Sequence, residues 1–172
     1  MAKSPEFSST SSDIEDSPEA VFQFMLEQGW SDGLPAIPPT ADRVRAMLDY
    51  VQRDAGELIG YINPDAGAAT VEKIAVNAVM AGCLPEYMPV LIAAVQAITE
   101  PSFNIHGLQT TTNPASPLLI VNGPVRGLIG LNSERGTLGP GYRANATIGR
   151  TIRLLLLNVG GAKPWATDMS VH

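Results

Sequence analysis

TVEKIAVNAVMAGCLPEYMPVLIAAVQAI, Thr70 to Ile98, is the stretch of sequence that decides the fold. It starts with a threonine suited to capping a helix, and the apolar residues that follow at helical spacing predict a helix up to Gly82. Pro85 is tolerated in the first turn of a helix, and the apolar run after it predicts a second helix through about Ile98. Two successive apolar helices predict a helix-rich domain.

Upstream of this stretch, two shorter helices are expected. Ser17 followed by Pro18 predicts a helix that ends near Gly29, and Thr40 caps another through about Gln52. The glycines and prolines of GWSDGLPAIPP, residues 29–39, predict an extended loop between them. Residues 1–16 are rich in serine and acidic residues, so we expect a disordered or cloning-derived tail before a single globular domain over residues 17–172.

Extended segments and one more helix are predicted around and beyond the central stretch. Leu58 to Ile62 is short and reads as a strand, Asn104 to Thr112 as an extended segment, and Leu118 to Val121 as a buried strand. A final helix is predicted from about Ala146 to Val159, before Gly160 and Gly161. The pattern predicts an α/β or α+β fold: a helix-rich single domain with a small sheet and long Gly/Pro-rich loops.

The composition narrows the possible partners. Of the 172 residues 45% are hydrophobic and 16% charged, and this low charge favours a homo-oligomer or a partner subunit. The net charge of −6 argues against nucleic acid. No apolar stretch reaches the roughly 20 residues that span a membrane, and the N-terminus does not resemble a signal peptide, so a cytoplasmic protein is expected.

Cys83, the one cysteine of the chain, is the first candidate for chemistry. It lies just before the predicted helix at Pro85, where the positive end of the helix dipole would favour the thiolate and hence a nucleophilic or redox role. The alternative is that Cys83 is a small buried hydrophobic residue.

Three further residues are candidates for acid–base or hydrogen-bonding roles. Glu72 and Asn77 lie on the polar side or edge of the helix that precedes Cys83, and a solvated helix face explains them equally well. His106 could act as an acid or base near neutral pH, although a lone histidine is more often structural.

The stretch GTLGPGYRANATIGR, Gly136 to Arg150, predicts a substrate-binding loop. Its glycines allow close approach of backbone N–H groups, the following helix presents its positive end, and two arginines add charge, so the loop could hold a small anionic molecule. Alternatively, the glycines form turns and the polar residues cap the helix. No residue spacing resembles a metal site, and the sequence indicates no particular cofactor. The candidate binding residues are Gly139, Gly141, Arg143, Asn145 and Thr147.

Four strings carry a family resemblance: GWSDGLPAIPPTADRVRAML, ATVEKIAVNAVMAGCLPEYMPVLIAAVQAI, FNIHGLQTTTNPASPLLIVNGP and GPGYRANATIGRTIRLLLLNVGGAKP. Together they resemble a poorly characterised bacterial family associated with the UGSC motif, a selenocysteine- or cysteine-Gly-Ser-Cys redox motif of companion proteins. The family pattern has a cysteine at the position of Cys83. This chain lacks a UGSC motif, so the resemblance implies a site that a partner subunit completes.

These observations lead to two hypotheses. In the first, the chain is a cysteine-dependent lyase, hydrolase or oxidoreductase, or a subunit of one, acting on a small anionic molecule. Cys83 would be the nucleophile or redox thiol, His106 or Glu72 would transfer the proton, and Asn77 would donate a hydrogen bond. In the second, the chain is a non-catalytic subunit of an obligate heteromeric enzyme, or contributes to an intersubunit metal site.

Overall fold

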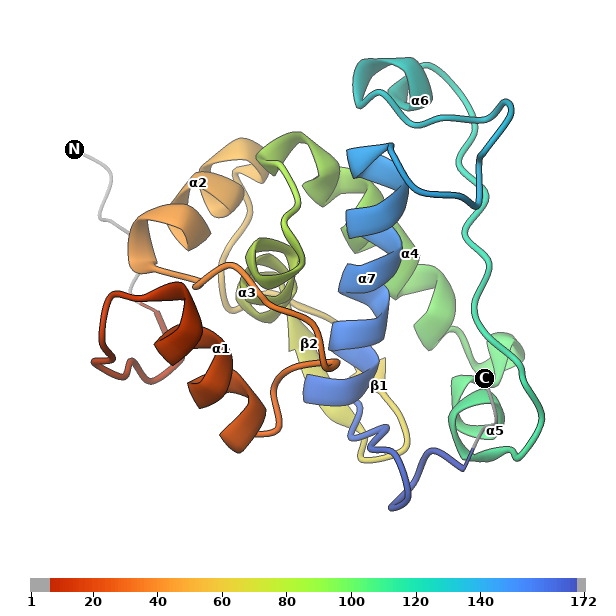
Figure 1. Ribbon diagram of the computed structural model, residues 1–172. Coiled ribbons are helices and arrows are strands. Elements are labelled where there is room, and N and C mark those ends of the chain that lie inside the picture. The colour runs from red at the N-terminus through yellow and green to blue at the C-terminus, as the bar shows by residue number, and fades with distance from the viewer. Residues whose placement is uncertain (1–6, 170–172) are drawn as a thin grey trace.

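Helix α3 (Val71–Ala81) forms the centre of the computed structural model, which describes residues 7–169 (Figure 1). The helix begins where the Thr70 side chain accepts a hydrogen bond from the Lys73 N–H, and it ends at Gly82 in the left-handed conformation, with φ of 93°. Both ends are those that the sequence predicts. Nearly all of its residues are buried, because neighbouring elements cover it on several sides.

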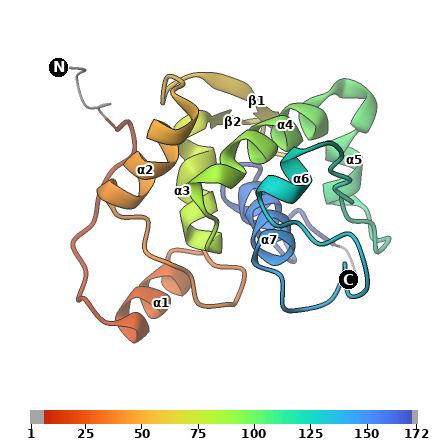
Figure 2. The same ribbon diagram turned by 90° about the horizontal axis from the view of Figure 1, so that it is seen from above.

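Helices α4 (Met88–Thr99) and α7 (Arg143–Asn158) pack with α3 to form the core. A short 3-10 turn, η1 (Pro85–Tyr87), leads into α4, so the helix predicted from Pro85 starts with a tighter turn. Helix α7 begins three residues before the predicted Ala146. Helix α1 (Pro18–Glu27) and helix α2 (Ala41–Val51) lie on the opposite side of the molecule from α5 and α6 (Figures 1 and 2).

The sheet consists of two antiparallel strands, β1 (Leu58–Ile62) and β2 (Gly67–Thr70). The first was expected and the second was not. Glycine lets the sheet approach the helices closely: a Cβ on Gly60 would lie 2.4 Å from Thr99 Oγ1, and one on Gly67 would lie 1.8 Å from the Val159 carbonyl oxygen. The result is the predicted helix-rich domain, of the α+β class, with a small sheet.

The prediction of an extended segment from Asn104 to Thr112 is wrong. The chain forms a 3-10 turn, η2 (Pro101–Phe103), and then helix α5 (Ile105–Thr110). Asn104 adopts the left-handed conformation and its side chain accepts a hydrogen bond from the Gly107 N–H at 3.3 Å. This cap stabilises a helical turn that the β-favouring threonines of the segment do not predict.

The prediction of a buried strand from Leu118 to Val121 is also wrong. The segment pairs with no strand, and no backbone hydrogen bond joins these four residues to another described residue. The Leu118 and Ile120 side chains are 71% and 74% exposed. The apolar pattern of a buried strand depends on a neighbouring strand, and the sheet that the described residues form lies elsewhere in the fold.

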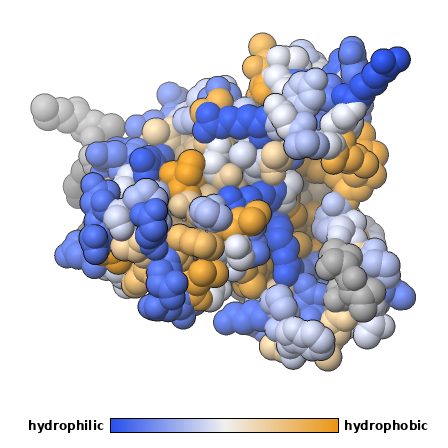
Figure 3. Space-filling view, viewed as in Figure 1, coloured by the Kyte–Doolittle hydropathy of each residue, from blue (hydrophilic) through white to orange (hydrophobic). Residues whose placement is uncertain are grey.

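Apolar side chains remain at the surface near this segment as well. Leu128, in the short helix α6 (Val125–Leu128), and Leu138, in the following loop, are both more than four-fifths exposed. Figure 3 shows apolar surface on the side of the molecule that carries α6. Among residues 7–169, no helix combines the length and the apolar character needed to cross a membrane.

Candidate functional site

Cys83 lies directly after α3, inside the core. Its side chain is buried, and Sγ lies 3.2 Å from Thr151 Oγ1 on α7. The Thr151 hydroxyl also donates to the Thr147 carbonyl oxygen at 2.8 Å, one turn earlier in α7. The thiol is therefore packed between α3 and α7, as in the alternative prediction of a buried cysteine.

The surroundings of Cys83 favour the neutral thiol. Burial raises the pKa of Cys83, and this effect outweighs the hydrogen bonds from Thr147 and Thr151 and the positive charge of Arg143. The prediction was that a helix dipole lowers the pKa of Cys83, and the structure raises this pKa instead. Pro85 opens a 3-10 turn of three residues, and desolvation in the core exceeds the influence of the helix end.

Two residues predicted to bind an anion do lie next to Cys83. Arg143 Nε donates to the Gly82 carbonyl oxygen at 2.9 Å, and Thr147 is within hydrogen-bonding reach of the thiol. The structure thus brings Cys83, Arg143 and Thr147 together. In this arrangement, Arg143 anchors the start of α7 to the end of α3.

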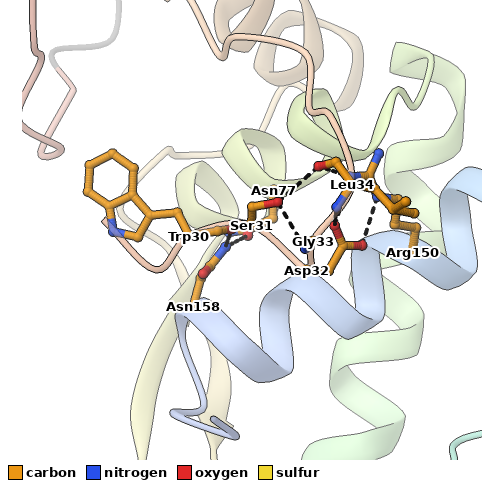
Figure 4. Close-up of polar contacts among 8 residues, drawn as sticks. All are labelled: Trp30, Ser31, Asp32, Gly33, Leu34, Asn77, Arg150 and Asn158. Atoms are coloured by element: carbon orange, nitrogen blue, oxygen red, sulfur yellow. Dashed lines mark hydrogen bonds and ion pairs between the residues drawn. The ribbon is translucent and has the colours of Figure 1, made fainter. Parts of the chain in front are cut away.

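Asn77 is part of a polar cluster that joins three segments (Figure 4). Its Oδ1 accepts a hydrogen bond from Asn158 Nδ2 at 2.8 Å, and the same nitrogen donates to the Trp30 carbonyl oxygen at 3.1 Å. These contacts connect α3, the end of α7 and the loop after α1. Asn77 therefore contributes to the packing of α3 against α7. It lies nearer the N-terminal end of α3 than Cys83 does.

The same cluster contains a partly buried ion pair between Asp32 and Arg150 (Figure 4). Arg150 donates from Nε and Nη2 to the two carboxylate oxygens of Asp32, at 2.9 and 2.8 Å, and from Nη2 to the Leu34 carbonyl oxygen at 3.1 Å. Burial alone would raise the pKa of Asp32, but the hydrogen bonds and charge of Arg150 hold it below its ordinary value.

Glu72 lies at the other end of α3 from Cys83, about 16 Å away along the helix axis. Its buried carboxylate accepts hydrogen bonds from the backbone and side chains of Ser8 and Ser9. Burial raises the pKa of Glu72, but these bonds outweigh it and lower the pKa. The serines belong to the segment that the sequence analysis placed outside the domain.

His106 is exposed, in α5, beyond the C-terminal end of α4. Cys83 precedes the N-terminal end of that helix, so the length of α4, about 18 Å, separates the two residues. The structure does not bring His106, Glu72 and Cys83 together. The described residues also contain no group of three His, Cys, Asp or Glu side chains placed to hold a metal ion.

The glycine-rich loop before α7 is held by Asn145. Its Nδ2 donates to the carbonyl oxygens of Asn132 and Thr137, at 2.9 and 3.1 Å, and its Oδ1 accepts from the Asn132 N–H at 2.9 Å. Gly139 closes a turn on Gly136, and Gly141 has a φ of 112°, a conformation that favours glycine. The turns match one part of the alternative prediction. Its other part, that polar residues of the loop cap the helix, is wrong, because α7 has Tyr142 at its N-cap and no side-chain capping hydrogen bond.

A cleft of about 840 Å³ lies on the face of α7 away from α3. Its walls are α4, α7, the extended segment of residues 115–121 and the loop of residues 131–138. Most of the lining is apolar, including Ile98, Phe103, Ile148, Ile152 and Leu156. The loop predicted to bind a small molecule does border this cleft, through Thr137, Leu138 and Asn145.

Polar side chains interrupt the apolar lining at a few points. Gln109 in α5 is only 5% exposed. Its side-chain amide makes no hydrogen bond with any residue that the structure describes, but it is not fully buried and borders the open cleft. Arg126 of α6, which hydrogen-bonds Ser133, lines the cleft at one point. Arg153 of α7 lines it at another. Asp168 lines the cleft beside Arg153, with 3.1 Å between Nη1 and Oδ2.

Three polar residues of the cleft, Gln109, Arg126 and Arg153, were not predicted as site residues. Gln109 falls in a segment wrongly predicted to be extended, so its burial could not be foreseen. Arg153 is three residues after Arg150, and that spacing places both on neighbouring faces of one helix. A single basic residue in the apolar string TIRLLLL was the available signal.

The charges of the chain are distributed unevenly. Of the eleven lysines and arginines, six lie after residue 100, whereas only two of the seventeen acidic residues, Glu134 and Asp168, do so. The first hundred residues therefore carry a net charge of −10 and the rest +4. Several of the basic side chains of this second part border the cleft or the loop above it.

Fold and site together define a helix-rich α+β domain with a ligand-sized, largely apolar cleft. Comparisons of the chain with protein-family models, with curated proteins and with solved structures find no match in any of the three. The resemblance to the family associated with the UGSC motif therefore stays a prediction.

Proposed function

We propose that this domain binds a small, predominantly apolar organic molecule in the cleft between α4, α5 and α7. The observation that carries the proposal is the cleft itself, a hollow of about 840 Å³ with largely apolar walls, which the Gln109 amide borders without a hydrogen-bonding partner among the described residues. Because this amide has both a donor and an acceptor, it could hydrogen-bond a ligand in the cleft.

The cleft has the chemistry of a small-molecule site. Its volume of about 840 Å³ lies within the range of such pockets, and its apolar walls carry a small number of polar groups that could orient a ligand. Cys83 does not line it. Binding in the cleft therefore does not require the thiol.

A thiol-dependent reaction at Cys83 remains a separate proposal. It is supported by the neighbouring Arg143 and Thr147, and it is opposed by the burial and raised pKa of the thiol. A role as the subunit of a larger enzyme is supported by the exposed apolar side chains at Leu118, Ile120 and Leu128. Neither proposal conflicts with ligand binding in the cleft.

A binding screen tests the proposal. Ligand-detected NMR with a library of uncharged and charged compounds that have apolar bodies should find ligands of the wild-type protein. Gln109→Met keeps the volume of the side chain and removes its amide, and we expect it to weaken their binding by about 10-fold, or 1.4 kcal/mol.

Gln96→Met is the matched control, because Gln96 is exposed on α4 and does not line the cleft. It should leave binding unchanged. A screen without ligands, or ligands that bind wild type and Gln109→Met equally well, would overturn the proposal.

A further inference from the structure

We infer that the ligand of the cleft is a carboxylate, and that Asp168 occupies the place of its carboxyl group at Arg153 in the free protein. The inference rests on the proposed function, since it names the ligand class of the same cleft. Its starting point is the contrast between two arginines of α7, Arg150 and Arg153.

Arg150 is held in place by the fold through two of its three guanidinium nitrogens, Nε and Nη2. It binds Asp32 through two parallel hydrogen bonds and adds a third bond to the Leu34 carbonyl oxygen, and its side chain is 20% exposed. Bidentate pairing of this kind is the strongest arrangement between arginine and a carboxylate. Nε and Nη2 of Arg150 are therefore not available to a ligand.

Arg153 is engaged far less. It reaches Asp168 through one hydrogen bond, from Nη1 to Oδ2 at 3.1 Å, while Nε and Nη2 bond to no described residue, and its side chain is 35% exposed. A carboxylate from outside could bind Arg153 through two hydrogen bonds where Asp168 makes one. The geometry therefore allows an incoming carboxylate to replace Asp168.

Asp168 reaches the cleft from a short backbone turn that follows α7. The turn is closed by hydrogen bonds from the Asp168 N–H to the Lys163 carbonyl oxygen and from the Trp165 N–H to the Asp168 carbonyl oxygen, at 2.9 and 3.1 Å. These backbone bonds do not involve the carboxylate. The closure of the turn does not depend on the contact between the carboxylate and Arg153.

The rest of the cleft suits a carboxylate with an apolar body. Arg126 adds a second positive charge to the lining, and Gln109 offers both a donor and an acceptor in the apolar part. Asp168 is the one acidic residue that borders the cleft among the described residues. Removing its negative charge should therefore strengthen the binding of an anion.

The experiment compares pairs of probes that differ only in charge: octanoate with octanamide, and indole-3-acetate with indole-3-acetamide. Isothermal titration measures their affinities for wild type, Asp168→Asn and Arg153→Met. We expect wild type to prefer each acid over its amide. Asp168→Asn should bind the acids about 10-fold more tightly and the amides unchanged, and Arg153→Met should lose the preference for acids.

Arg135→Met is the matched control, because Arg135 is exposed and does not line the cleft. It should retain the preference for acids. Circular dichroism and thermal unfolding confirm that each variant is folded, and Arg153→Gln replaces Arg153→Met if the latter is not.

The outcomes separate this inference from the function on which it rests. If acids and amides bind equally well to wild type, or Asp168→Asn strengthens both alike, the carboxylate subsite is wrong and binding in the cleft stands. If no probe binds to any variant and the wider screen also fails, the proposed function falls and the inference falls with it.

Discussion

The two faces of α7 use polar side chains in opposite ways. On the face toward α3 and the loop after α1, Arg150 and Asn158 hydrogen-bond to Asp32, Asn77 and the backbone. On the face toward α4, Nε and Nη2 of Arg153 donate to no described residue. The cleft that Arg153 borders also contains the Gln109 amide, which has no hydrogen-bonding partner among the described residues. The polar side chains of the first face stabilise the fold, whereas those of the second face keep hydrogen-bonding groups that could bind a ligand.

Substituting Arg150 should give the largest effect on stability. Arg150→Met leaves the Asp32 carboxylate buried without its partner, so we expect a loss of about 3 kcal/mol in the free energy of unfolding. Chemical denaturation measures it. Arg135→Met, on the exposed loop, should change stability by less than about 0.5 kcal/mol. Equal effects of the two substitutions would contradict the distinction between the faces.

The reactivity of Cys83 should show an intermediate effect. Because burial raises the pKa of the thiol, alkylation by iodoacetamide at pH 8 should be at least about 10-fold slower than for glutathione. The rate should still rise above pH 9, where a free thiol approaches its plateau. Unfolding in urea should restore ordinary reactivity, and a native rate equal to that of glutathione at pH 7 would reinstate an activated thiol.

The smallest effect is expected at Gln109. Gln109→Met replaces an amide that hydrogen-bonds no described residue by an apolar side chain of similar size, so the free energy of unfolding should change by less than about 1 kcal/mol. Thermal unfolding measures this. A loss above about 1 kcal/mol would mean that the amide serves the fold, and the two faces of α7 would then not differ as described.

The sequence predicts the central helices because their signals are local. Thr70 caps α3 and Gly82 ends it in a left-handed conformation, both features of single residues. Leu118 to Val121 shows the limit of such reasoning. An apolar run predicts that something covers it, but its burial depends on a partner element that local sequence does not specify.

The candidate site could be predicted only in part. Arg143, Thr147 and Cys83 do come together, as their places at the ends of α3 and α7 allow. Glu72 and His106 do not join them, because proximity along a helical chain is not proximity in space: one helix length separates each from Cys83. Gln109 could be identified as a candidate site residue only from the fold, which places it in the lining of the cleft.

The uneven distribution of charge has a consequence for how fast a ligand arrives. Residues 101–172 carry a net charge of +4, and Arg126 and Arg153 line the cleft. The local field therefore favours the approach of the anionic ligand that we propose. Association of the proposed anionic ligand should therefore be faster at low ionic strength, and added salt should slow it by screening this field.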